Sequence, residues 1–493
     1  MSTCRVRCQV QLQPTTPIPL VVESLAAGYA ARIEKINNSR FVLFQFLMMS
    51  NQIRRVVITG LGVVCPLGRD LETFWTNLVD KKSGISDLDC LPEGGIDVRY
   101  GGQAKCFTGD IENFGPLEKS LQRAIKKNQK VMCREIEMGV AACQMALAHS
   151  GLAAPESRNP ERTGIVYGSD YILTRPEEFS DGVAACFDSE KHFQLLRWPT
   201  DGRPKVNPLW LLKYLPNMPA SHVAIYNDLR GPSNSVTIRE ASSAASIAEA
   251  VATIRRGAAD VMLAGATGSR LEPLRALHFS VSEKLASPRT DPGKMSRPFD
   301  AARDGSVLGE GAGALVLESL ENAVARGAKI WGEVIGGVGS AVGSTFAGKS
   351  RDFVRIATKN VVSGLMAKGQ SAGLKLESGN CHVHACGKGE IDSDRSEAKG
   401  IQDGFDDEKI SVTSAKSYFG NLGAGSAAVE IVASCLALDR QILFPLLNCD
   451  DLDSACPITV ADSAASAGEA FVSLSYSSQG QASGVLIRRV LSA

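Results

Sequence analysis

The sequence lacks an excess of charge of either sign. Its 493 residues include 53 Lys and Arg and 53 Asp and Glu, so the formal net charge is zero. A chain without net charge is not drawn to nucleic acid or to a membrane surface by its overall field. We therefore expect neither a nucleic-acid-binding nor a membrane-bound protein, although a local basic patch for an acidic partner remains compatible with this balance.

The sequence also lacks paired cysteines and long apolar runs. Its 13 cysteines are scattered and none stands in a C-x-x-C pair. In a chain too long to need disulfides, this indicates reduced thiols and a cytoplasmic protein. The longest apolar run near the N-terminus, Phe41 to Met49, is interrupted by Gln45. It falls short of the roughly 20 residues that span a bilayer, and no secretory signal layout is present.

The first 50 residues do not share the patterning of the chain that follows. We expect residues 1–50 to be an extension produced by an upstream start, with Met48 or Met49 as the actual one. A targeting or docking segment is the alternative. The first 48 residues are predicted to be dispensable for the fold.

The most strongly patterned stretch runs from Ser235 to Gly265. A strand pattern, with Val236 and Ile238 alternating, is followed by a helix-spaced run rich in small residues. Small residues let a helix lie close to a neighbouring backbone, so this helix is expected to be buried. The turn presents one side chain at the helix N-terminus, where the helix dipole stabilises an anion, and that side chain is Glu240.

This turn resembles the nucleophile elbow of the β-ketoacyl-acyl-carrier-protein synthases, in the thiolase superfamily. The opening strand and glycine turn Ile58–Gly68 (ITGLGVVCPLG) and the glycine- and charge-rich run Ser296–Gly313 are similar to motifs of that family. The resemblance implies a duplicated α/β fold, thiolase-like, with mixed sheets in αβαβα layers. Strands and helices alternate in two comparable halves, which we place at 52–327 and 328–491 after the extension at 1–50.

The resemblance implies a catalytic cysteine and two histidines, and the chain departs from all three. Counting without gaps places the acyl-carrying cysteine on Glu240, which cannot form a thioester. It places the first histidine on Cys386, whereas a shift of two residues would give His384 instead. The second histidine belongs to a Lys-Ser-x-x-Gly-His motif, in which Lys416 is kept and Asn421 replaces the histidine.

The resemblance also implies surrounding positions. Lys416 is expected to pair with Glu430, and the gating phenylalanine of a glycine-rich run falls on Gln479. Phe279 and Ser242 are expected to contribute to substrate binding. An amide such as that of Asn421 can donate a hydrogen bond to an oxyanion, but it does not exchange a proton near neutral pH as histidine does.

A metal site is the less favoured interpretation of one cluster. His382, His384 and Cys386 alternate along a predicted strand, and these residue types can bind zinc. Strand histidines are more often hydrogen-bonded core residues, and no fourth ligand is evident. We expect neither a metal nor a cofactor.

Taken together, the motifs predict a synthase homologue that does not condense. It resembles the chain-length-factor subunits, which lack the cysteine and pair with an active synthase in fatty-acid or type II polyketide-like biosynthesis. One alternative is a repurposed thiolase-fold enzyme that acts on carrier- or CoA-bound acyl groups through Glu240. Another is a homodimeric scaffold that binds acyl chains. Acyl carrier protein or acyl-CoA is the expected partner, in a homodimer or a heterodimer with an active synthase.

Overall fold

The structure is a computed structural model, and it describes residues 54–92, 94–346, 349–350, 352–406, 408–462 and 465–490. The predicted extension at 1–50 and the last residue of the predicted second half, Leu491, lie outside the described residues. No helix in the described ranges is long and apolar enough to cross a membrane.

One mixed sheet of eleven strands organises the described chain, and it consists of two groups of strands. The first group contains, in order, β1 (Val56–Val64), β7 (Glu310–Ser319), β6 (Val261–Ser269), β4 (Thr163–Gly168) and β5 (Ser233–Val236). The second contains β8 (Gly332–Ala341), β15 (Gln481–Arg488), β14 (Ala470–Tyr476), β11 (Cys381–His384), β12 (Ser411–Thr413) and β13 (Thr459–Val460). The groups meet where β1 pairs with β8, and only Val57 and Ile58 of β1 take part in that pairing.

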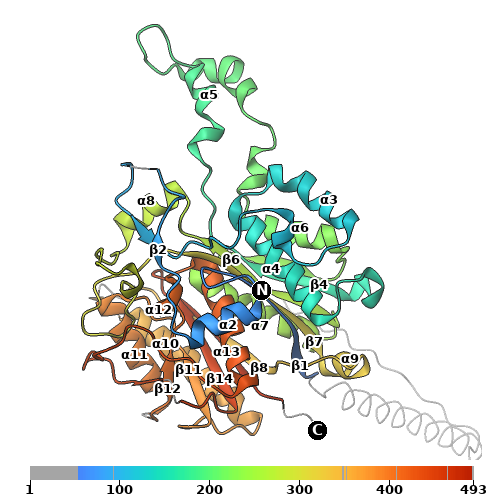
Figure 1. Ribbon diagram of the computed structural model, residues 1–493, viewed down its shortest axis with the longest axis vertical. Helices are drawn as coiled ribbons and strands as arrows, with labels where there is room; N and C mark the ends of the chain where they lie inside the picture. The colour runs from blue at the N-terminus through green and yellow to red at the C-terminus, as the bar shows by residue number, and fades with distance from the viewer. Residues whose placement is uncertain are drawn as a thin grey trace, which may run out of the picture. The chain divides into compact units, whose positions relative to one another are not determined.

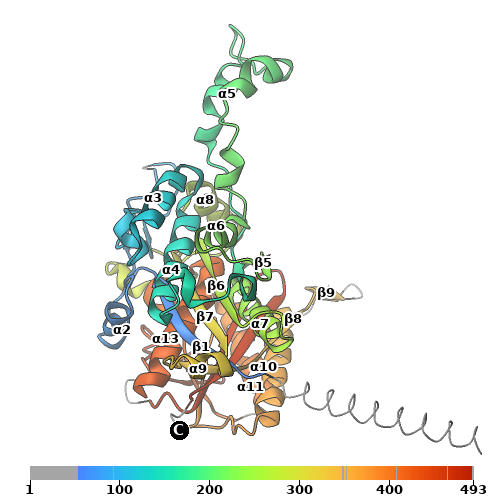
Figure 2. The same cartoon turned by 90° about the vertical axis from the view of Figure 1, so that its right-hand side faces the viewer.

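Helices form three layers around the two groups of strands (Figures 1 and 2). α4 (Arg134–Ser150) and α6 (Met218–Asn227) cover the outer face of the first group. α10 (Phe353–Ser371), with α11 (Ile391–Gly404) packed on it, covers the second. Between the groups lie α7 (Ser242–Arg255) and α13 (Ser426–Arg440), which contact strands of both. The predicted αβαβα fold with mixed strand pairing is confirmed.

The remaining elements are short and lie around these layers. They are α2 (Leu71–Val79), α3 (Lys119–Asn128), α5 (Ser180–Ala184), α8 (Pro273–Ser282), α9 (Leu320–Ala325) and α12 (Lys416–Phe419), with the strand pairs β2 (Ser86–Asp87) and β3 (Tyr100–Gly101), and β9 (Thr345–Phe346) and β10 (Lys349–Ser350). The segment between β4 and α6, which includes α5, extends away from the layers in both views (Figures 1 and 2).

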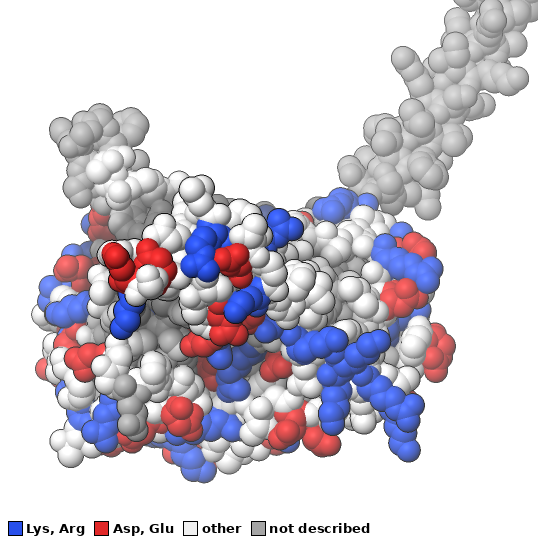
Figure 3. Space-filling view, turned by 90° about the horizontal axis from the view of Figure 1, so that it is seen from above, with Lys and Arg blue, Asp and Glu red and all other residues white. Residues whose placement is uncertain are grey.

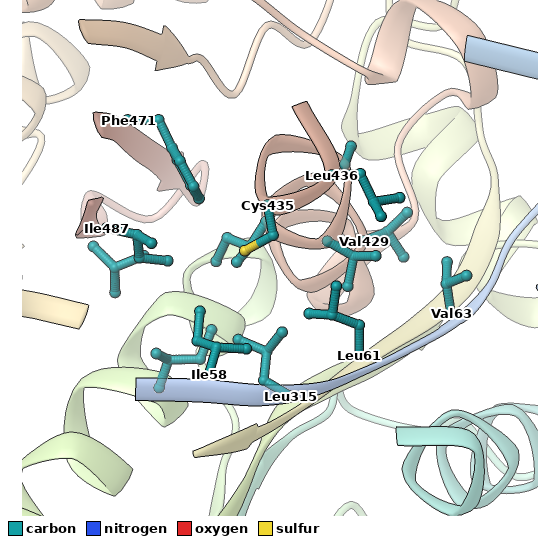
Figure 4. Close-up of a cluster of buried hydrophobic side chains, with 14 of the residues drawn as sticks. Ile58, Leu61, Val63, Leu315, Val429, Cys435, Leu436, Phe471 and Ile487 are labelled. Atoms are coloured by element: carbon teal, nitrogen blue, oxygen red, sulfur yellow. The ribbon is translucent and has the colours of Figure 1, made fainter. Parts of the chain in front are cut away.

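The main core lies at the central helical layer. Figure 4 shows Leu61 and Val63 on one side of β1, facing Val429 and Leu436 of α13. All four side chains are at most 1 % exposed. Each buried aliphatic side chain contributes about 1.5–3 kcal/mol relative to an exposed one, so this layer holds α7 and α13 firmly between the strands.

Candidate functional site

The predicted strand-to-helix turn is present and is tightly packed. β5 ends at Val236, a single 3₁₀ turn spans Arg239–Ala241, and α7 begins at Ser242. Arg239 has a φ of 55°, a left-handed conformation that is uncommon outside glycine. The hydroxyl of Ser242 accepts a hydrogen bond from the Ile238 N–H at 2.9 Å, which fixes the residue before the turn. The elbow therefore presents Glu240 in one defined direction.

Small residues bring α7 close to the second group of strands, as the sequence predicts. A Cβ added to Gly337 of β8 would lie 2.4 Å from the Cβ of Ala248 on α7. No larger pair fits at this contact, so the glycine and alanine set the distance between the helix and the sheet. The start of α7, and with it Glu240, is thereby buried between the two groups of strands.

Glu240 is 1 % exposed, and three donors surround one of its oxygens. Oε1 accepts from Arg270 Nη2 at 2.5 Å and lies 3.0 Å from Lys388 Nζ. The amide Nδ2 of Asn421 donates to the same oxygen at 3.3 Å. The predicted site residues Glu240 and Asn421 are thus in contact, together with two cations that the sequence did not single out.

The charges of this cluster stabilise one another. Burial pushes the pKa of Glu240 upward, but the charges of Lys388 and Arg270 outweigh burial and hold the pKa below its ordinary value. Burial likewise lowers the pKa of Lys388, whereas Glu240 and Glu283 raise it above its ordinary value. The cluster therefore holds a carboxylate anion between two cations at neutral pH.

Arg270 is fully buried and has two further partners. Its Nη1 donates to Glu283 Oε2 at 2.7 Å, and its guanidinium lies 4.0 Å from the centroid of the Phe279 ring. Phe279, predicted to bind substrate, therefore contacts a cation of the protein itself. On the other side of the cluster, Lys388 Nζ lies 5.0 Å from the centroid of the Tyr476 ring.

A second buried arginine extends the charged interior on α8. The guanidinium of Arg275 pairs with Glu135 and, at 2.9 Å, with Asp170, and all three side chains are at most 1 % exposed. Asp170 also raises the pKa of Arg270, so the two arginine networks are electrostatically connected. Buried ion pairs, together with the Phe279 and Tyr476 rings, therefore fill the interior next to the elbow.

The environment of Asn421 explains its orientation. Its Oδ1 accepts from the Gly423 N–H at 3.0 Å and from the Ser426 hydroxyl at 3.3 Å. Because both bonds use the carbonyl end, the amide nitrogen is directed toward Glu240. Asn421 acts here as a donor to a resident anion.

Cys386 lies beyond the end of β11, in a loop anchored by Glu397. The backbone N–H groups of Cys386 and Gly387 donate to the two carboxylate oxygens of Glu397 at 2.6 and 2.8 Å. Burial raises the pKa of the Cys386 thiol to about 12, so the sulfur is a neutral thiol at physiological pH. The same loop carries Lys388 into contact with Glu240.

Lys416 and Glu430 form the ion pair that the motif predicts. Lys416 Nζ lies 2.5 Å from Glu430 Oε1, and both side chains are at most 1 % exposed. The pair joins α12 to α13. It is a structural link between two elements that flank the elbow.

His384 is engaged in the core. Its Nε2 accepts from the Ala415 N–H at 3.0 Å, so its proton is on Nδ1, which lies 2.8 Å from the Ser434 hydroxyl. His382 also contacts Ser434, at 3.2 Å, and burial lowers the pKa of His384 well below its ordinary value. The two histidines therefore share a serine, and no three His, Cys, Asp or Glu side chains in the described ranges are grouped to hold a metal ion.

Gln479 lies on the exposed turn between β14 and β15, where its N–H donates to the Ser477 hydroxyl at 3.2 Å. The buried residue from this region that reaches the cluster is Tyr476. The structure thus joins Glu240, Asn421 and Phe279 in one cluster and places Gln479 and His384 outside it.

Sequence reasoning missed Arg270, Lys388 and Glu283. A signal was available for the two cations, because a carboxylate at a buried elbow needs a buried positive partner. Arg270 follows a strand of small and apolar residues, and Lys388 lies within the glycine-rich sequence CGKG. Glu283 had no comparable signal.

Comparison with known proteins matches both halves of the described chain to one family. The N-terminal domain of β-ketoacyl synthases matches residues 53–323, and the C-terminal domain matches residues 367–450. The 3-oxoacyl-[acyl-carrier-protein] synthase 2 of Vibrio harveyi is 30% identical over 410 residues, covering 82% of this chain and 91% of that protein. The mitochondrial 3-oxoacyl-[acyl-carrier-protein] synthase of Arabidopsis thaliana is 31% identical over 444 residues, covering 85% and 89%.

Solved structures agree with the fold. A β-ketoacyl synthase from Burkholderia phymatum superposes with a TM-score of 0.72 at 25% identity, covering 89% of this chain and all of that one. The ishigamide ketosynthase/chain length factor has the same fold, with a TM-score of 0.70 at 24% identity, covering 89% and 99%.

Proposed function

The chain belongs to the β-ketoacyl synthase family, and we propose that it is a member that does not condense. In this proposal it acts as a chain-length-factor-like partner of an active synthase in fatty-acid or type II polyketide-like biosynthesis. The observation that carries the proposal is the elbow carboxylate of Glu240, held between Arg270 and Lys388. Relatives named as 3-oxoacyl-[acyl-carrier-protein] synthases support acyl-thioester chemistry as its setting.

The chemistry of the cluster argues against condensation. Covalent acyl transfer needs an activated nucleophile such as a thiolate, and the elbow offers a carboxylate whose Oε1 receives three donors. The cations that would stabilise a developing oxyanion are already neutralised by Glu240. Cys386 is a neutral thiol and Asn421 is a donor without a titratable proton.

The alternative of catalysis through Glu240 has weaker support. A general base works best when its pKa lies near the operating pH, whereas Lys388 and Arg270 hold the pKa of Glu240 low. An acyl-binding scaffold would need space for the chain, and the interior beside the elbow is occupied by the Arg270 and Arg275 ion pairs.

The free edge of the sheet supports a dimer. β5 is the last strand of the sheet and pairs only with β4 in the described chain. The Val236 carbonyl accepts from the N–H of Ser169, just after β4, so by alternation the N–H and C=O of Ser235 point away from β4. Within one chain that N–H donates to Asn234 Oδ1 at 2.9 Å, a contact that a second strand would replace. An open strand edge is a pairing site, and a two-fold axis would bring two such edges together. We propose that β5 pairs across the subunit interface.

A basic surface on α3 and the 3₁₀ turn that follows it (Gln129–Val131) supports a carrier-protein partner. The exposed residues of this surface are Lys119, Arg123, Lys126, Lys127 and Lys130. None of them forms an ion pair with a described residue, and Figure 3 shows Lys and Arg side chains gathered on the side where α3 lies. A cluster of one sign steers an oppositely charged protein toward it, and we propose an acidic acyl carrier protein as that partner.

Sedimentation and product analysis with an active synthase test this function together. We expect the chain to form a dimer alone or with the synthase, and the length of the acyl products to change when the chain is added. Ser235→Pro removes an outward N–H and should weaken association, whereas Ser235→Ala keeps the N–H and should not. A monomer under both conditions, with unchanged products, would refute the proposal.

A further inference from the structure

β1 has one edge without a complete strand partner. β7 pairs with it from Val56 to Val64, whereas β8 pairs only with Val57 and Ile58. Beyond Ile58, the described residues supply no strand along the β8 side of β1. The Leu61 N–H on that side donates instead to His149 Nδ1 at 3.0 Å. A side chain of α4 thus takes the place of a strand at this edge.

A cleft of about 590 Å³ opens beside this edge, between α2, the end of α4 and α13. Its size is in the range typical of small-molecule sites, about 300–1,000 Å³. The apolar residues that line it include Leu61, Val63, Leu71, Met145, Trp331 and Leu436. Figure 4 shows that Leu61, Val63 and Leu436 belong to the main core, so the floor of the cleft is rigid.

Two polar groups of the cleft are donors. Because His149 Nδ1 accepts from Leu61, the neutral ring carries its proton on Nε2. The ring also packs on Trp331, with 5.0 Å between the centroids. The other donor is Arg69, whose hydrogen bond to the Glu112 carbonyl is long, at 3.3 Å.

Arg69 is the cation of the cleft that lacks an anion. No carboxylate in the described ranges lies within ion-pair distance of its guanidinium. The acidic residues that line the cleft are already used, because Glu72 pairs with Arg440 and Asp70 accepts from the Thr73 N–H at the start of α2. The cleft therefore offers an apolar floor and one cation, Arg69, without a carboxylate partner among the described residues, while the carboxylate of Asp70 is directed to the start of α2.

We propose that this cleft binds an amphipathic monocarboxylate, with its apolar body against Leu71, Met145 and Trp331, which are partly exposed, and its carboxylate on Arg69. An Arg–carboxylate contact of this kind forms charge-assisted hydrogen bonds, which are stronger than those between neutral groups. The site lies on the β1 edge and shares no residue with the Glu240 cluster. It is a ligand site in addition to the proposed function.

Calorimetric titration of the full chain with decanoate, decan-1-ol and decyltrimethylammonium tests the proposal. We expect saturable decanoate binding with a dissociation constant below about 1 mM, with decan-1-ol at least about tenfold weaker and the ammonium weaker still. Arg69→Gln should remove the advantage of decanoate over decan-1-ol. Met145→Trp should fill the cleft and remove binding of both.

A second measurement locates the ligand independently of these variants. A decanoate brominated at its terminal carbon should quench Trp331 fluorescence in the otherwise unmodified chain, and the quenching should be lost in Trp331→Phe. Unchanged far-ultraviolet circular dichroism and thermal midpoints of the variants exclude misfolding as the cause. The proposal is overturned by the absence of saturable decanoate binding, by equal affinity in Arg69→Gln, or by quenching that persists in Trp331→Phe.

Discussion

Arg270 at the elbow and Arg69 at the β1 edge differ in burial and in whether a carboxylate of the protein pairs with them. The Arg270 side chain is 0% exposed, pairs with Glu240 and Glu283, and lies on an aromatic ring. Arg69 is partly exposed, lines an apolar cleft and has no carboxylate partner among the described residues. One cation is neutralised by the protein, and the other is left for a ligand.

At the elbow the buried charges are paired within the protein, whereas the cleft at the β1 edge contains a cation without a carboxylate partner among the described residues. At the elbow, Glu240 occupies the place of an external anion, so any acyl or carboxylate ligand would have to displace a buried ion pair. At the β1 edge, an anion would add a partner without removing one. In the proposed function the elbow has a structural role, and the proposed ligand site lies elsewhere in the fold, at the β1 edge.

The largest effect on stability should come from removing the elbow anion. Glu240→Ala leaves Lys388 buried without a carboxylate contact in the described part of the chain, and Arg270 with one partner fewer. Breaking a buried pair in this way costs about 3–5 kcal/mol. Asp403→Ala, which removes the partly exposed ion-pair partner of Arg355, is the control and should cost about 0–1 kcal/mol. Urea unfolding measures both, and equal losses would contradict a buried, tightly paired Glu240.

Replacing Glu240 should also change how the free energy of unfolding depends on pH. The pKa of Glu240 is lower in the folded state than its unfolded value of about 4.3. Its contribution is therefore complete above about pH 5 and is lost as the pH falls through about 4 toward the folded pKa. The difference in unfolding free energy between wild type and Glu240→Gln should stay constant from about pH 6 to 8 and shrink below about pH 4. A difference that grows on acidification would show that Glu240 is protonated in the folded state.

The smallest effect on stability should come from replacing Arg69. Arg69→Gln removes a partly exposed cation without a carboxylate partner, so the free energy of unfolding should change by less than about 0.5 kcal/mol. Arg270→Gln, which leaves Glu283 without its ion pair and Glu240 with Lys388 alone, is the matched comparison and should be strongly destabilising. Similar losses in both variants would remove the distinction between the two sites.

The sequence predicts the fold and the elbow well because both depend on local patterns. The turn before α7, the burial of that helix through its small residues, and the Lys416–Glu430 pair follow from residues whose spacing is visible along the chain. The ion pairs of Glu240 depend on Arg270 and Lys388, which are 30 and 148 residues away in sequence. Only the folded chain brings these cations to the elbow.

Residues on turns and edges were harder to predict. Gln479 lies on an exposed turn, because the β14–β15 hairpin directs Tyr476 inward and the turn outward. The cleft at β1 depends on where β8 stops pairing, and no motif in the sequence marks that point. The first feature is set by the register of a local hairpin, and the second by the pairing of two strands far apart in sequence.

Mass spectrometry of carrier-bound products tests the central claim most directly. The purified wild-type chain, incubated with malonyl and acyl thioesters of an acyl carrier protein and no other synthase, should yield no ketoacyl product. Glu240→Cys should permit at most acyl loading, since Cys386 and Asn421 do not supply two imidazoles and loss of one oxyanion donor commonly costs about 10²–10³ in rate. Ketoacyl product from the wild-type chain alone would contradict the account.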